Sequence, residues 1–159
     1  MELLPVICNL SEKKLAGKRL TMSFSLNQTR ELWQSFMPRR KEIENPVGAV
    51  LYSIEVYPPG FFDHFDPSVA FKKWAAIVVT SFETLPPGME PFTLSAGMYV
   101  VFLYKGLASE AAAFYRQIFE TWLPGSGYRL DNRPHFARMG EKYKNEDPES
   151  EEEIWIPVC

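Results

Sequence analysis

Two parts of the 159-residue sequence repeat the same order of predicted elements: strand, helix, strand, strand. Alternating or β-branched apolar residues indicate the strands, and apolar residues three or four positions apart indicate the helices. The first set occupies 20–26, 29–37, 49–57 and 71–82, and the second occupies 97–105, 110–123, 135–143 and 153–158. The duplicated order restricts the fold, because two such units can place their strands side by side in one sheet.

Local signals support the duplication. In the helical segments 33–38 and 118–124, an aromatic residue is followed two positions later by proline. Because proline cannot continue a helix, both helices are predicted to end there. Each half is also predicted to open with a glycine, Gly17 or Gly97, before its first strand.

We therefore predict one α+β domain over 1–159, made of duplicated βαββ units at about 17–82 and 93–158. The strands would form one antiparallel-rich sheet with two helices on one face. A concave groove between the two repeats is then the natural place for a ligand.

Composition and charge exclude several classes of protein. The formal net charge of −3 argues against a basic nucleic-acid footprint. No run of 18 apolar residues is present, and the first residues lack the basic and apolar regions of a signal peptide. The predicted elements leave no length for a helix-turn-helix. We expect a cytoplasmic protein that binds neither a membrane nor nucleic acid.

Metal and cofactor chemistry have no support in the sequence. The two histidines, His64 and His135, lack metal-ligand spacing, and no glycine-rich phosphate loop or nucleophile elbow occurs. We expect no metal and no cofactor. Cys8 and Cys159 lie at opposite ends of the chain and are interpreted as free thiols, with a disulfide between them as the alternative.

Aromatic residues make up 14% of the chain, more than the filling of a core this size requires. The rings on the predicted helix faces are assigned to the core: Phe36, Phe114, Phe119 and Trp122. The aromatic loop at 61–65 is either a mobile lid or a satellite cluster packed under a long loop. The remaining rings, on the strands, are candidates for the lining of a ligand site.

In the order and spacing of its segments, the whole chain resembles the GyrI-like small-molecule-binding domain, the fold of the effector-binding domain of AraC-type and some MerR-type multidrug regulators. The resemblance is carried by 17–23, 32–36, 39–40, 52–57, 71–75, 97–106, 122–124, 132–136, 143 and 152–158. It implies a stand-alone pocket for flat, apolar, often cationic compounds, lined by aromatic rings around a buried carboxylate. Rings attract cations, and a desolvated carboxylate complements a delocalised positive charge without fixed geometry.

One position departs from the family pattern. Where the family usually has the pocket glutamate, this sequence has Ala137. On a strand, Ala137, Met139 and Glu141 share one face, so the missing acid would have pointed into the pocket. Glu153 or Glu55 could supply a replacement carboxylate. No catalytic residue is assigned.

Strand alternation gives the candidate ligand-binding residues. Ile154, Ile156 and Val158 are predicted to face the helices, which leaves Trp155 and Glu153 on the opposite face, toward the pocket. The full set of predicted ligand-binding residues is Tyr52, Ile54, Trp74, Tyr99, Phe136, Ala137, Met139, Glu153 and Trp155. For Tyr52, Trp74 and Trp155, packing in the core is the alternative.

Three functions are open at this point. The first is binding or sequestration of planar, apolar, often cationic aromatic compounds. The second is hydrolysis of cyclopropane-bearing aromatic genotoxins, which the resemblance suggests and which Ala137 would impair because the general-base position is empty. The third is a protein-interaction module that uses the acidic segment 146–153, for which a solvated loop is the simpler interpretation.

Overall fold

The computed structural model describes residues 5–159. Its strands are β1 (Val6–Leu10), β2 (Lys13–Met22), β3 (Pro46–Val56), β4 (Phe71–Val79), β5 (Glu90–Leu94), β6 (Gly97–Lys105), β7 (His135–Met139) and β8 (Glu151–Pro157). Helix α1 (Thr29–Phe36) continues as a 3₁₀ segment, Met37–Glu42. The second helical region comprises a 3₁₀ turn at Ala108–Glu110, α2 (Ala111–Gln117), a π-helical turn at Ile118–Trp122 and α3 (Leu123–Gly125).

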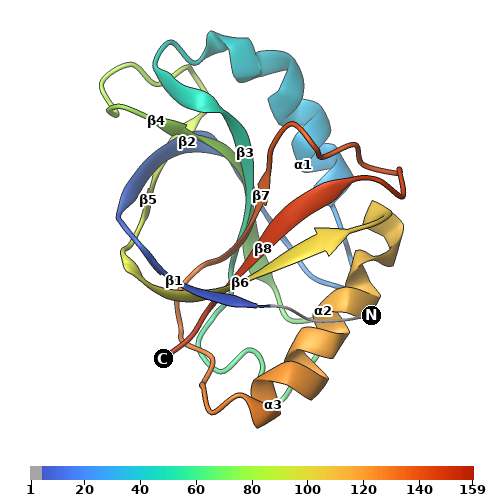
Figure 1. Cartoon of the computed structure of the whole chain (residues 1–159). Helices are drawn as coiled ribbons and strands as arrows, with labels where there is room; N and C mark the ends of the chain where they lie inside the picture. Colours follow the sequence, from blue (N-terminus) through green and yellow to red (C-terminus); the bar gives the residue numbers. More distant parts are fainter. Residues whose placement is uncertain (1–4) are drawn as a thin grey trace.

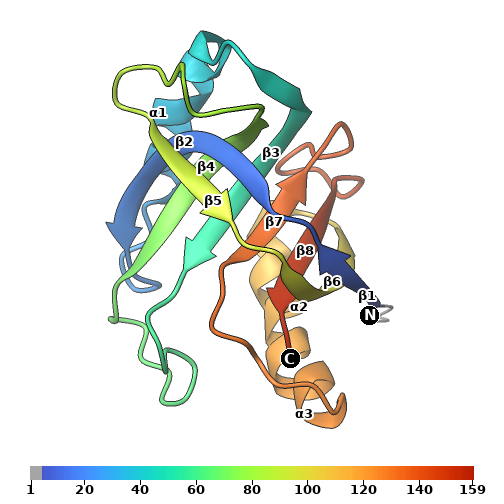
Figure 2. The same cartoon turned by 90° about the vertical axis from the view of Figure 1, so that its left-hand side faces the viewer.

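All eight strands form one antiparallel sheet in the order β1-β6-β8-β7-β3-β4-β2-β5. The strand order is symmetric about its centre, where β3 and β7 lie side by side (Figure 2). Outward from the centre, β4, β2 and β5 follow β3 on one side, and β8, β6 and β1 follow β7 on the other. Each edge strand crosses over, because β1 pairs with β6 and β5 pairs with β2. The predicted α+β class, the antiparallel sheet and the two helical regions are confirmed.

Three details of the sequence-based prediction are wrong. The edge strands β1 and β5 were not predicted, and β2 lies at Lys13–Met22 rather than at 20–26. Gly17 therefore lies inside β2 instead of preceding it. Residues 13–19 contain no β-branched or aromatic side chain, and pairing with β4 on one side and β5 on the other overrides that weak local preference.

Helices cover one face of the sheet (Figure 1). On α1, Leu32 and Phe36 are buried against Ala75 and Ile77 of β4. In the second helical region, Phe114 and Ile118 pack against Phe102 and its neighbours on β6 and β8. Burial of each such side chain contributes about 2 kcal/mol, so the two helices are fixed independently on the two halves of the sheet.

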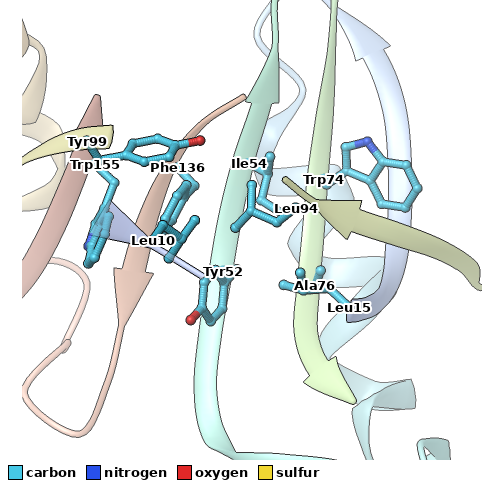
Figure 3. Close-up of a cluster of buried hydrophobic side chains, with 10 residues drawn as sticks. All are labelled: Leu10, Leu15, Tyr52, Ile54, Trp74, Ala76, Leu94, Tyr99, Phe136 and Trp155. Atoms are coloured by element: carbon cyan, nitrogen blue, oxygen red, sulfur yellow. The ribbon is translucent and has the colours of Figure 1, made fainter. Parts of the chain in front are cut away.

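The sheet curls around its other face, which is also apolar (Figures 1 and 3). The buried residues there, the inner cluster, are Leu10, Leu15, Tyr52, Ile54, Trp74, Ala76, Leu94, Tyr99, Phe136 and Trp155. Apolar packing on both faces explains why several strands are almost continuously hydrophobic. Within residues 5–159, no helix is long and apolar enough to cross a membrane.

Candidate functional site

A large groove lies on the helix side of the sheet, between α1 and the second helical region. It has a volume of about 2180 Å³ and is lined by residues of both helical regions and of β3, β7 and β8. Ten aromatic residues line it: Phe24, Trp33, Tyr57, Phe62, Phe65, Tyr115, Phe119, Phe136, Tyr143 and Trp155. The side chains of two of these, Phe136 and Trp155, pack in the inner cluster on the opposite face of the sheet. The groove exists because each helix packs on its own half of the sheet and leaves the central strands open between them.

Strand alternation determines which side chains form the groove floor. On β3, Ser53 and Glu55 line the groove, whereas Tyr52 and Ile54 point into the inner cluster. Cross-strand pairing places Ala137 of β7 opposite Ser53. The floor at the centre of the sheet is therefore small or polar, which leaves room above it.

A buried ion pair lies at the floor. The Lys73 Nζ atom on β4 donates a hydrogen bond of 2.7 Å to a carboxylate oxygen of Glu55, and the two side chains are only 11% and 13% exposed. Lys73 and Glu55 are cross-strand partners, so the backbone pairing holds the two charges together. The pair is neutral as a unit and leaves other carboxylates of the groove without a basic partner.

Glu152 on β8 is such a carboxylate. It lines the groove, is partly buried, and has no hydrogen-bond or ion-pair partner in the part of the chain that the structure describes. Burial, with a further contribution from the negative charge of Glu55, raises its pKa to about 7, against a smaller opposing effect of Lys73. Glu152 therefore changes charge near neutral pH and would gain from a cationic neighbour.

Two tyrosines that line the groove lie near the carboxylate of Glu55. Burial raises the pKa of Tyr57 and of Tyr115 well above the ordinary value, and the charge of Glu55 adds to the effect in both. Both phenols remain protonated, so they offer hydroxyl donors and ring faces to the groove. His135 lies against Tyr57, with ring centroids 4.9 Å apart, and burial lowers its pKa to about 3, so it is uncharged.

The residues predicted from the sequence fall into two groups. Phe136, Ala137, Met139 and Trp155 line the groove. Tyr52, Ile54, Trp74, Tyr99 and Glu153 do not line it. The first four of these belong to the inner cluster on the other face of the sheet (Figure 3), where Phe136 and Trp155 also stack, with ring centroids 5.1 Å apart.

Glu153 interacts with Trp155 and Arg138 on that other face. Its carboxylate accepts a hydrogen bond of 3.1 Å from Trp155 Nε1 and lies 3.4 Å from Arg138 Nη1. Glu152, one residue earlier, takes the helix side together with Ile154 and Ile156. The assignment of Ile154 and Ile156 to the helix side was correct, and the same alternation identifies Glu152 as the groove carboxylate once the groove is known to lie on that side.

The aromatic loop forms the satellite cluster that was one of its two interpretations, and Phe62 packs against that cluster. Phe61 is buried with Met22 and Phe71 in a satellite cluster. Phe62 and Phe65 line the groove. Of the helix rings assigned to the core, Phe119 also lines the groove, and its ring stacks on Phe62 at 5.0 Å.

Hydrogen bonds hold the first residue of the acidic segment 146–153 in place. The Glu146 carboxylate accepts bonds of 2.7 Å from the Ser109 backbone N–H and 2.9 Å from its hydroxyl, at the start of the second helical region. A carboxylate there satisfies free N–H groups and complements the helix dipole. Cys8 and Cys159 are free thiols.

Comparison with known proteins shows which family and which folds the chain is similar to. The model of the family described as GyrI-like small molecule binding domain matches residues 5–158. The transcriptional regulator BrlR of Pseudomonas aeruginosa is 27% identical over 130 residues, which are 80% of this chain and 45% of that regulator. The chain thus spans about half the length of this curated relative.

Solved structures match over the whole chain. The C-terminal domain of EcmrR superposes with a TM-score of 0.72 and 17% identity, covering 100% of this chain and 99% of that one. SAV2435, solved bound to tetraphenylphosphonium, superposes with a TM-score of 0.71 and 16% identity, covering 100% and 94%. At these identities the likeness is one of fold.

Proposed function

The chain belongs to the family of GyrI-like small molecule binding domains, and from that premise we propose that its groove binds apolar aromatic cations. The observation that carries the proposal is Glu152, a carboxylate without a partner among residues 5–159, set in a groove of about 2180 Å³ that ten aromatic residues line. The cation of the SAV2435 complex is of the same chemical class.

The chemistry of the lining favours a positive ligand. Six carboxylates line the groove against four basic side chains, and one of the basic groups, Lys73, is already paired with Glu55. The positive charge of a cation beside Glu152 would compensate electrostatically for the solvation that this carboxylate loses by burial. Aromatic faces add about 0.5–2 kcal/mol for each close cation–ring contact, without demanding one ligand shape.

The proposed ligand contacts include residues predicted from the sequence and residues that only the structure identified. Ala137 and Met139, which were predicted from the sequence, form the floor. Glu152 takes the role of the pocket glutamate that the family usually has at the position of Ala137. Tyr57 and Tyr115 supply walls. In this proposal the predicted residues outside the groove act indirectly, because their packing on the other face holds β3, β7 and β8 in place.

Tetraphenylphosphonium titrated into the protein, followed by calorimetry and tryptophan fluorescence, tests the proposal. We expect saturable binding that Glu152→Gln weakens about tenfold, because a close charge pair in a partly desolvated site is worth about 1.5 kcal/mol. Glu153→Gln is the matched control: it is the same substitution one residue along the strand, on the opposite face, and should change affinity less than twofold. Absence of binding to the wild-type protein would refute the proposal.

Hydrolysis of cyclopropane-bearing aromatic compounds is a second candidate, favoured by the pKa of Glu152 near 7, which suits general acid–base catalysis at neutral pH. Glu152 would accept a proton from a water molecule whose oxygen forms a bond to a cyclopropane carbon. The carbon–carbon bond of that ring breaks, and its electron pair passes to the conjugated aromatic system, which takes up a proton from the solvent. Loss of the substrate chromophore, compared between the wild type, Glu152→Gln and Ala137→Glu, tests this. Equal rates in all three variants and in buffer would reject it.

A further inference from the structure

Two loops meet at one end of the groove. The Ser25 backbone N–H donates a hydrogen bond of 2.9 Å to the Pro67 carbonyl oxygen, which ties the loop after β2 to the loop between β3 and β4. Each loop contributes one ring to the groove lining, Phe24 from the first and Phe65 from the second. The two rings meet edge to face, with centroids 5.5 Å apart.

Both rings are unusually exposed for phenylalanine. Phe24 is 45% exposed and Phe65 is 55% exposed, although both rest on a buried ring, Phe61, which is 6% exposed. Solvent therefore covers one side of a fixed aromatic surface. Burial of that surface by an apolar group would be favourable by the hydrophobic effect, in proportion to the area covered.

A continuous row of rings runs from this surface along the groove. The Phe24 ring stacks on Tyr57, with centroids 6.3 Å apart and planes at 15°. Tyr57 contacts Phe62 at 4.9 Å, and Phe62 stacks on Phe119 at 5.0 Å. Tyr57 is thus the junction, since the charge of Glu55 acts on its hydroxyl while its ring contacts Phe24.

We infer that the groove has two chemically distinct subsites and selects elongated, two-part ligands: a cationic head beside Glu152 and a flat aromatic arm that covers Phe24 and Phe65. This inference rests on the proposed function and adds to it the class of ligand. A cation without an arm fills only the first subsite. The arm needs no charge or hydrogen-bond donor, because the second subsite presents ring faces.

Two monocations with the same head distinguish the subsites. Benzyltrimethylammonium is short, and (4-phenylbenzyl)trimethylammonium adds one phenyl ring as an arm. We expect the longer cation to bind the wild-type protein about 3- to 10-fold more tightly, the range of one aromatic contact. Phe24→Ser and Phe65→Ser should each reduce that advantage, measured as the ratio of the two affinities.

Leu26→Ser is the matched control, because Leu26 is 64% exposed in the same loop as Phe24 and does not line the groove. It should preserve the advantage of the longer cation. The inference is overturned, with the proposed function intact, if both cations bind and Phe24→Ser and Phe65→Ser leave their ratio at the wild-type value. If neither cation binds the wild-type protein, the proposed function fails as well.

Discussion

Protonation of Glu152 should control the affinity of the groove for cations. Burial raises the pKa of this carboxyl to about 7, so the fraction ionised falls from most of the molecules at pH 8 to about one in a hundred at pH 5. If only the ionised form bound tetraphenylphosphonium, affinity would fall about 100-fold over this range. The rings still attract the ligand when Glu152 is neutral, so we expect a fall of about tenfold.

Two other titratable groups of the groove do not change charge in this range. Burial raises the pKa of Tyr115 well above its ordinary value. Burial lowers the pKa of His135 to about 3, so this ring stays neutral throughout. The pH dependence of cation binding is therefore assigned to Glu152.

The sign for stability is opposite to that for binding. Glu152 has a folded-state pKa of about 7 against a reference value of 4.5, so the folded state holds this proton more tightly than the unfolded chain does. Its favourable contribution is complete below about pH 4.5 and is lost as the pH rises to about 7, by at most about 3 kcal/mol. Bound cation should remove this loss.

Calorimetric titrations and urea unfolding between pH 5 and pH 8, on the wild type and Glu152→Gln, measure both effects. The variant should bind with a nearly constant, weak affinity. It should also lack the loss of stability that the ligand-free wild type shows as the pH rises from 5 to about 7. Glu153→Gln should behave like the wild type. Parallel pH profiles in the wild type and Glu152→Gln would refute the assignment.

Three further substitutions test the packing that holds the site. Gly17→Ala should destabilise the fold by about 3 kcal/mol in urea unfolding, because the new Cβ would lie 2.1 Å from the Ala75 carbonyl oxygen between paired strands; an unchanged midpoint would contradict this close approach. Lys73→Met should cost about 3 kcal/mol by leaving Glu55 buried without a partner, and Lys73→Met with Glu55→Leu should recover most of it. Leu103→Thr, at a side chain 61% exposed, should change stability by less than about 0.5 kcal/mol, and a larger loss would reveal a contact within the protein.

The repeated element order predicted the fold class, one antiparallel sheet and two helical regions. These follow from hydrophobic periodicity, which depends on the local sequence. The edge strands β1 and β5 and the first part of the internal strand β2 were not predictable in the same way. Residues 13–19 form the first part of β2 only because β4 and β5 supply hydrogen-bond partners on both sides.

Alternation along β8 correctly separated Ile154 and Ile156 from Trp155. The sequence by itself therefore determined which side chains share a face of each strand, because that is a property of the extended backbone. It did not determine which face borders open space. Both faces of this sheet are apolar, so composition could not distinguish the face that curls closed from the one that the helices cover incompletely.

Only the tertiary structure decided that question. The helices pack on separate halves of the sheet and leave the centre open, which makes Glu152 rather than Glu153 the carboxylate of the groove. The same packing joins Phe24 and Phe65, from two loops far apart in the sequence, into one aromatic surface. Local periodicity specifies the elements and their faces, whereas the position of a cavity depends on how distant elements fill, or fail to fill, the space between them.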